Sequence, residues 1–155
     1  MDHFHYRDRV LHCEDVPLAE LAETYGTPLF VYSRATLLHH LHQVQAAFAE
    51  AKPILCFSIK TNANIHIARL MREHGSGFDV TSGGELYRAL LAGGDPNQIV
   101  FAGVGKTDDE MRFALENDIL FFNVESEQEL HTLGAVAKAM GKVARATLRV
   151  NPDLP

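Results

Sequence analysis

The chain has 155 residues, of which 46% are hydrophobic and 22% are charged, and these proportions are ordinary for a globular protein. The net charge of −6 is spread without a basic stripe, which argues against a nucleic-acid partner. The sequence has no charged leader followed by an apolar run and no long apolar span, so neither secretion nor a membrane partner is predicted. We therefore expect a cytoplasmic location.

The first part of the chain, residues 1–33, is organised differently from the rest. Residues 8–15 are polar with scattered apolar side chains, and residues 17–25 have the pattern of a helix that ends at Gly26. Residues 27–32 predict a strand, and Ser33 is the expected N-cap of a helix that runs to about Ala51.

Five apolar runs follow, and turns and helix signals separate them. The runs cover residues 54–59, 77–81, 99–102, 119–122 and 146–150. A helical pattern spans residues 65–74, and three further helices are expected to begin with capping boxes at Ser82–Glu85, Thr107–Glu110 and Ser126–Glu129. Strands that alternate with capped helices predict right-handed βαβ units around a parallel sheet.

Lys60 stands at the end of the first apolar run, before the turn signal of residues 61–64. If residues 54–59 form a strand, then Cys56, Ser58 and Lys60 share one face of it. An amine in a partly desolvated pocket loses proton affinity and can attack a carbonyl carbon. The structural alternative is a lysine at a strand end whose ammonium extends into solvent.

Polar residues gather where the predicted strands end. They are Lys60, Asp79, Thr81, Asn123, Arg149 and Asn151. In parallel α/β folds the site lies at the carboxyl ends of the strands, so we expect these residues to surround it.

The alternation of side chains along the strands, with small or polar residues on one face and apolar residues on the other, favours a barrel. The alternative is an open doubly wound sheet. The residues expected to face inward are Ser58 and Lys60, Gly77 and Asp79, and Thr147 and Arg149. Those expected to face the helices are Phe57, Val80, Ala102, Phe122 and Leu148.

Four separated motifs resemble one known family. They are Phe57-Ser58-Ile59-Lys60-Thr61-Asn62, the stretch from Gly75 to Leu86, Phe122-Asn123-Val124-Glu125-Ser126 and Leu148-Arg149-Val150-Asn151-Pro152. Together they are similar to diaminopimelate decarboxylases, enzymes that use pyridoxal 5'-phosphate (PLP) on an alanine-racemase-like barrel. The resemblance runs from about Thr27 to Asp153. The sequence departs from the family at Ser58 and Thr61, two small residues that stand where alanine is usual.

The resemblance implies roles for individual residues. Lys60 matches the lysine to which PLP is bound covalently, and Asp79 matches an acid that lines the cofactor site. Arg149 matches an arginine near the cofactor ring, at its hydroxyl group, and Glu85 matches a nearby acid. The structural alternatives are that Asp79 caps a loop and that Arg149 forms an ion pair with Asp79.

The length bears on the fold, because a (β/α)8 barrel needs about 200 residues or more. The chain supplies five strands, so we expect an incomplete α/β barrel, about five of eight β/α units, over residues 34–155. The resemblance implies that residues 1–33 belong with a second, β-rich domain. It also implies that the family's phosphate-binding loop, the acid facing the pyridine nitrogen and a motif donated across the dimer come later than residue 155.

The implied function is PLP-dependent decarboxylation of meso-diaminopimelate to L-lysine by a homodimer, with this portion inactive alone. Residues 82–86 and 103–106 resemble the diaminopimelate branch more than the ornithine branch. Two alternatives stay open: a PLP-dependent decarboxylase of ornithine or arginine, and an inactive barrel fragment that only binds a partner.

Three further patterns were weighed as sites. Gly105-Lys106-Thr107 ends like a phosphate-binding loop, but Val100 stands where the first glycine is required. His39 and His42 are three residues apart on a predicted helix without a third ligand, so no metal site is expected. Cys13 and Cys56 fit neither a disulfide framework nor a zinc spacing.

Overall fold

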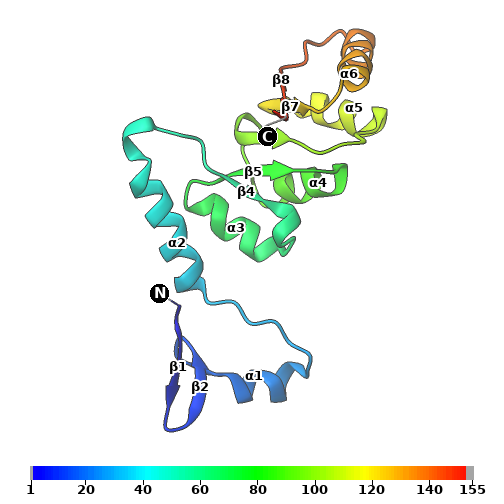
Figure 1. Cartoon of the computed structure of the whole chain (residues 1–155). Helices are drawn as coiled ribbons and strands as arrows, with labels where there is room; N and C mark the ends of the chain where they lie inside the picture. The colour runs from blue at the N-terminus through cyan, green and yellow to red at the C-terminus, as the bar shows by residue number, and fades with distance from the viewer. Residues whose placement is uncertain (1, 153–155) are drawn as a thin grey trace. The chain divides into compact units, whose positions relative to one another are not determined.

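The computed structural model describes residues 2–152, and the chain falls into two compact units, Met1–Pro53 and Ile54–Pro155 (Figure 1). The boundary predicted after residue 33 is based on family resemblance, not on compactness, and it stays a prediction. Within the described residues, none of the helices combines the length and the apolar character needed to cross a membrane.

The first unit begins with a small antiparallel sheet in the order β1-β2-β3. The strands are β1 (Phe4–Arg7), β2 (Val10–Cys13) and β3 (Val16–Pro17), and helix α1 (Leu18–Tyr25) follows. These strands were not predicted. The hairpin between β1 and β2 turns at Asp8 and Arg9, both with positive φ, whereas hairpins of this kind are usually signalled by Asn-Gly or Asp-Gly.

The rest of the first unit contains helix α2 (Arg34–Ala47) and a 3₁₀ turn, η1 (Ala49–Ala51). Ser33 caps α2 as predicted, because its Oγ accepts a hydrogen bond of 3.0 Å from Thr36 N. The strand predicted over residues 27–32 is wrong: no described strand pairs with this segment, and Phe30 is 84% exposed. A short apolar run alone does not make a strand when no neighbour supplies ladder hydrogen bonds.

The second unit is a parallel five-stranded sheet in the order β4-β5-β6-β7-β8. Its strands are β4 (Cys56–Ser58), β5 (Gly77–Val80), β6 (Ile99–Phe101), β7 (Phe121–Val124) and β8 (Ala146–Leu148). Its helices are α3 (Ile65–Glu73), α4 (Gly83–Leu91), α5 (Asp108–Glu116) and α6 (Glu127–Ala139), with 3₁₀ turns η2 (Ile59–Thr61) and η3 (Pro96–Gln98).

The strand order decides between a barrel and a doubly wound sheet. A doubly wound sheet reverses its strand order at a switch point and carries helices on both faces. Here the order is unbroken, and Ala68, Leu86, Met111 and Leu133 from the four successive helices join Phe78 and Phe122 in one buried cluster. All four helices of this unit therefore cover the same face of the sheet, and the incomplete parallel barrel is confirmed.

The predicted parity holds for β4, β5 and β7 but is wrong for β6, where Phe101 rather than Ala102 shares the buried face of Val80 and Phe122. Val80 and Phe122 are buried in the core, and Phe57 packs against it. Leu148 has the same parity but is 66% exposed, because no described helix covers β8. β7 is displaced from its predicted position, so that Ile119 and Leu120 precede it and Asn123 lies within it.

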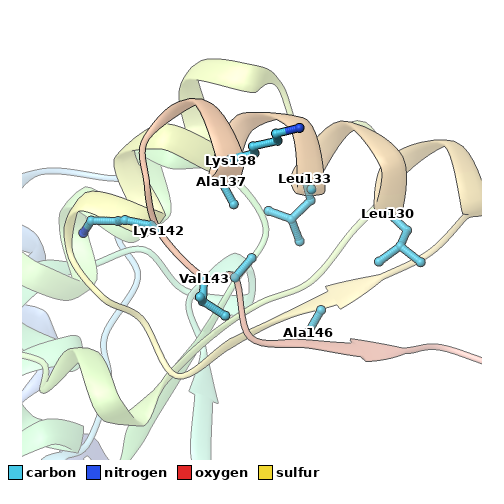
Figure 2. Close-up of a pocket in the computed structure, with 9 residues that line it drawn as sticks. Leu130, Leu133, Ala137, Lys138, Lys142, Val143 and Ala146 are labelled. Atoms are coloured by element: carbon cyan, nitrogen blue, oxygen red, sulfur yellow. The ribbon is translucent and has the colours of Figure 1, made fainter.

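A groove of about 400 Å³ lies between α6 and the segment that enters β8. Figure 2 shows Leu130 and Leu133 of α6 pointing toward the strand that carries Ala146. Val143, which is 89% exposed, also lines the groove. This edge of the sheet therefore presents apolar side chains to solvent.

Candidate active site

Lys60 lies in a tight turn immediately after β4. The strand ends at Ser58, and Thr61 Oγ1 donates a hydrogen bond of 2.7 Å to Ser58 O, which closes the 3₁₀ turn η2. The expectation that Lys60 continues the face of the strand is wrong, since the backbone leaves the extended conformation at Ile59. Ile59 is 1% exposed and anchors the turn in the core, whereas Lys60 is exposed.

The amine of Lys60 makes no hydrogen bond or ion pair with any residue that the structure describes. The turn that carries it packs against β5 and α4. Lys60 is thus a primary amine held by a fixed turn at the carboxyl end of a strand, and it is available to react with a carbonyl group.

Asp79 lies on the neighbouring strand, directly opposite Ser58. Ser58 Oγ donates a hydrogen bond of 2.9 Å to Asp79 Oδ2. Cys56 is on the same strand face as Ser58, and burial, with the charge of Asp79, raises the pKa of its thiol above the usual 9.0. The structure therefore brings together Asp79 and the strand that leads to Lys60.

Arg149 follows β8, at the other side of the sheet, and β6 and β7 separate β8 from the strand of Asp79. Its guanidinium lies 3.3 Å from Glu125 Oε1. The alternative in which Arg149 forms an ion pair with Asp79 is therefore wrong, because strand order places an acid of the β7–α6 loop beside it. The Glu125 side chain is 8% exposed and that of Arg149 is 57% exposed.

Glu85 closes the loop that follows β5. Its carboxylate accepts hydrogen bonds from Thr81 N (2.8 Å) and Thr81 Oγ1 (3.1 Å). Ser82 Oγ accepts from Glu85 N, so only half of the predicted capping box forms here. In a complete box the Glu85 carboxylate would accept from Ser82 N, but here it accepts from Thr81, the residue before the N-cap.

The other two predicted boxes differ from each other. Thr107 and Glu110 form a complete box, and Glu110 Oε1 also accepts a hydrogen bond of 2.7 Å from Gly83 N. Glu129 Oε2 instead accepts from Glu125 N at 3.0 Å. These carboxylates therefore connect loops at the carboxyl edge of the sheet as well as capping helices.

The sequence did not identify Lys106 as a functional residue, yet its side chain is only 1% exposed. Its Nζ donates to Gly103 O (2.7 Å), Asn123 O (2.8 Å) and Glu129 Oε1 (2.5 Å). It also lies 5.7 Å from the centre of the Phe101 ring. No local pattern identifies such a lysine, because two of its acceptors are 17 and 23 residues away.

The chemistry of this edge fits an aldehyde-bearing cofactor with a polar ring. Lys60 offers an unpaired amine to the aldehyde, and Asp79 offers a carboxylate oxygen, Oδ1, that accepts no hydrogen bond from the described residues. Arg149 adds a half-exposed guanidinium. Among the described residues, every buried side-chain nitrogen and oxygen atom has a hydrogen-bond partner. That these three residues bind the cofactor stays a prediction.

Comparison with known proteins agrees with this chemistry. Residues 34–155 match the family described as pyridoxal-dependent decarboxylase, pyridoxal binding domain. The chain is 50% identical to the diaminopimelate decarboxylase of Vibrio cholerae, over 99% of this chain and 37% of that protein. The chain thus spans little more than a third of the length of this relative.

Solved structures agree as well. The diaminopimelate decarboxylase of M. jannaschii, in complex with L-lysine, is 36% identical with a TM-score of 0.94, over 99% of this chain and 37% of that chain. The arginine decarboxylase of the Paramecium bursaria Chlorella virus is 20% identical with a TM-score of 0.73, over 89% of this chain and 36% of that chain, and shows the fold alone. The chain belongs to the pyridoxal-dependent decarboxylase family, matching its pyridoxal binding domain from residue 34 onward.

Proposed function

We propose that this chain carries the PLP-binding lysine of a decarboxylase that converts meso-diaminopimelate to L-lysine and carbon dioxide. The observation that carries the proposal is the amine of Lys60, which has no hydrogen-bond partner among the described residues and lies in a closed turn beside the Ser58–Asp79 pair. The 50% identity to a diaminopimelate decarboxylase supports the choice of substrate.

The residues of the chain have separate tasks in this proposal. Lys60 would hold the cofactor through its side-chain amine. Asp79, oriented by Ser58, and Arg149 would line the cofactor site and offer it a carboxylate and a guanidinium. When bound, PLP supplies the conjugated ring that accepts the electron pair left by the departing carboxylate.

The partners of the whole protein follow from the same proposal. We expect a small amino-acid substrate, a cytoplasmic location and a homodimer, and neither a nucleic-acid nor a membrane partner. The family resemblance supports the dimer, and the net charge of −6 disfavours nucleic acid. On this view the 155-residue chain is inactive alone, because the relatives are much longer.

Cofactor attachment is tested on the chain itself. It is incubated with PLP, reduced with borohydride and mapped by peptide mass spectrometry, beside Lys60→Ala and Lys138→Ala, which removes an exposed lysine of α6. A single stoichiometric adduct at Lys60, lost in Lys60→Ala and kept in Lys138→Ala, is the expected result. Scattered labelling that is the same in all three proteins would mean that no cofactor site forms in this chain alone.

The substrate is tested in a hybrid in which this chain replaces the matching part of the Vibrio cholerae enzyme. Carbon dioxide release is measured with meso-diaminopimelate, ornithine and arginine. Release from meso-diaminopimelate is expected, and it should disappear in Lys60→Ala. Release from ornithine or arginine alone would favour the other decarboxylases. A hybrid that binds PLP but releases nothing from any substrate would favour a chain that acts only as a binding partner.

A further inference from the structure

The buried ammonium of Lys106 has a complete set of acceptors. Its three N–H groups are matched by Gly103 O, Asn123 O and Glu129 Oε1. The side chains of Lys106 and Glu129 are 1% and 9% exposed. Burying such a pair costs desolvation energy, and well-packed apolar residues are often as stable at such places. The pair therefore calls for a role other than filling the core.

The pair holds the ends of two neighbouring strands. Gly103 follows β6, and Asn123 lies near the end of β7, so one ammonium fixes both strand ends. The second oxygen of Glu129 accepts a hydrogen bond of 3.0 Å from Glu125 N. The backbone at Glu125 is thereby fixed to the same pair.

Glu125 passes this constraint to Arg149. Its Oε1 accepts hydrogen bonds from Gly103 N at 3.2 Å and from the Arg149 guanidinium at 3.3 Å. The Glu125 carboxylate is nearly buried, whereas the Arg149 side chain is half exposed. Arg149 follows β8, which pairs with β7 and has no described strand on its other side. The direction of the guanidinium thus depends on where Glu125 stands.

We infer that Lys106 and Glu129 are positioning residues that act through Glu125 to direct Arg149 toward the cofactor. The inference rests on the proposed function, because Arg149 faces the cofactor only if that proposal holds.

The first test needs no cofactor. The chain is treated with phenylglyoxal, an arginine reagent, and the modification rate of Arg149 is divided by that of Arg112, whose ion pairs lie within α5. Loss of the Arg149–Glu125 ion pair should raise the reactivity of Arg149 by up to about fivefold. Because Lys106→Met and Glu129→Gln would release Glu125, each should raise the ratio about two- to fivefold.

The matched control for this test is Lys142→Met. Lys142 also donates to a backbone carbonyl, Leu115 O, but has no contact with Glu125. This variant should leave the ratio unchanged. If Lys106→Met fails to fold by far-UV circular dichroism, Glu129→Gln, which keeps an acceptor oxygen, decides the question. An unchanged ratio in the folded variant would overturn the inference.

The second test measures PLP binding by absorbance in a double-mutant cycle of Lys106→Met and Arg149→Ala. We expect Lys106→Met to raise the dissociation constant by about twofold or more, and to have no further effect when Arg149 is already removed. An equal effect in both backgrounds would make Lys106 a purely structural residue and would overturn the inference. A hybrid enzyme that keeps its activity in Lys60→Ala would instead refute the proposed function. The phenylglyoxal ratio would still decide whether Lys106 positions Arg149.

Discussion

Ser58 Oγ donates a hydrogen bond of 2.9 Å to Asp79 Oδ2, and the register of β4 and β5 places the two residues directly opposite each other. One oxygen of the carboxylate is therefore held by the strand that leads to Lys60. The other oxygen accepts no hydrogen bond from the described residues and is free for a ligand.

Removal of the Ser58 hydroxyl should weaken this site. In Ser58→Ala the Asp79 carboxylate loses a donor, so we expect the free energy of unfolding to fall by about 1 kcal/mol and the PLP dissociation constant to rise severalfold. Urea denaturation and absorbance titration measure the two effects. Thr61→Val is the matched control, because it removes a hydroxyl of the same turn that donates to Ser58 O rather than to Asp79. Equal losses of PLP affinity in both variants would contradict a specific role of Ser58.

Gly77 should not tolerate a side chain. A Cβ atom at this position would lie 2.3 Å from Gln98 O and 3.2 Å from Cys56 Sγ, so β5 would have to move away from its neighbours. We expect Gly77→Ala to cost about 1–3 kcal/mol of unfolding free energy in urea denaturation.

Gly134 offers the matched control for this change. It lies within α6, and a Cβ there would have no neighbour within 4 Å. Gly134→Ala should therefore stabilise the chain by about 0.5–1 kcal/mol. If both substitutions shift the urea midpoint in the same direction, the close contacts at Gly77 are not the cause of the stability change in Gly77→Ala.

Glu110 should make the stability of the chain depend on pH. Burial opposes ionisation of this carboxyl, but hydrogen bonds from Gly83 N, Thr107 N and Thr107 Oγ1 outweigh it and hold its pKa below the usual 4.5. Because the folded pKa is lowered, the stabilisation is present above pH 4.5 and is lost as pH falls through the folded pKa.

The measurement is urea denaturation of the wild type and Glu110→Gln between pH 7 and pH 3. We expect the wild type to be the more stable at pH 7 and the difference to shrink below about pH 4.5. A difference that stays constant over this range would show that the ionised carboxylate is not what stabilises the fold.

The edge at β8 should promote association. β8 pairs only with β7 among the described strands, and Leu148 on it is 66% exposed. Exposed edge strands pair with other chains, and a lysine on such an edge blocks this pairing. We expect light scattering to show concentration-dependent association that Leu148→Lys reduces. Leu91→Lys, at a 51% exposed position of α4, should not reduce it. A sharp monomeric species of the wild type would contradict this prediction.

The sequence was informative where local patterns decide the structure. Apolar runs and helix caps predicted every β/α unit of Ile54–Pro155, because each helix covers the strand beside it. Lys60 was found because a charged residue directly follows an apolar run. Its 3₁₀ turn was not predicted, since the turn depends on burial of Ile59 in a core built from later units.

The sequence was uninformative where contacts between residues far apart in the chain determine the local structure. The hairpin of β1 and β2 turns at Asp8 and Arg9, and arginine stands where a type I′ turn usually has glycine, so the sequence carries no clear turn signal. The segment at 27–32 is rich in strand-forming apolar residues but has no partner strand among the described residues. Lys106 and Glu125 acquire their roles through contacts between loops, and no spacing rule for helices or strands describes such contacts.

The carboxylates that connect successive loops also bear on how the chain folds during synthesis. Gly83 N is satisfied by Glu110, 27 residues later, and Gly103 N by Glu125, 22 residues later. Each loop therefore leaves the ribosome before the group that fixes it, and it becomes rigid only when the next unit has been made. An engineer who transplants one loop of this edge into another protein would need to move the following unit as well.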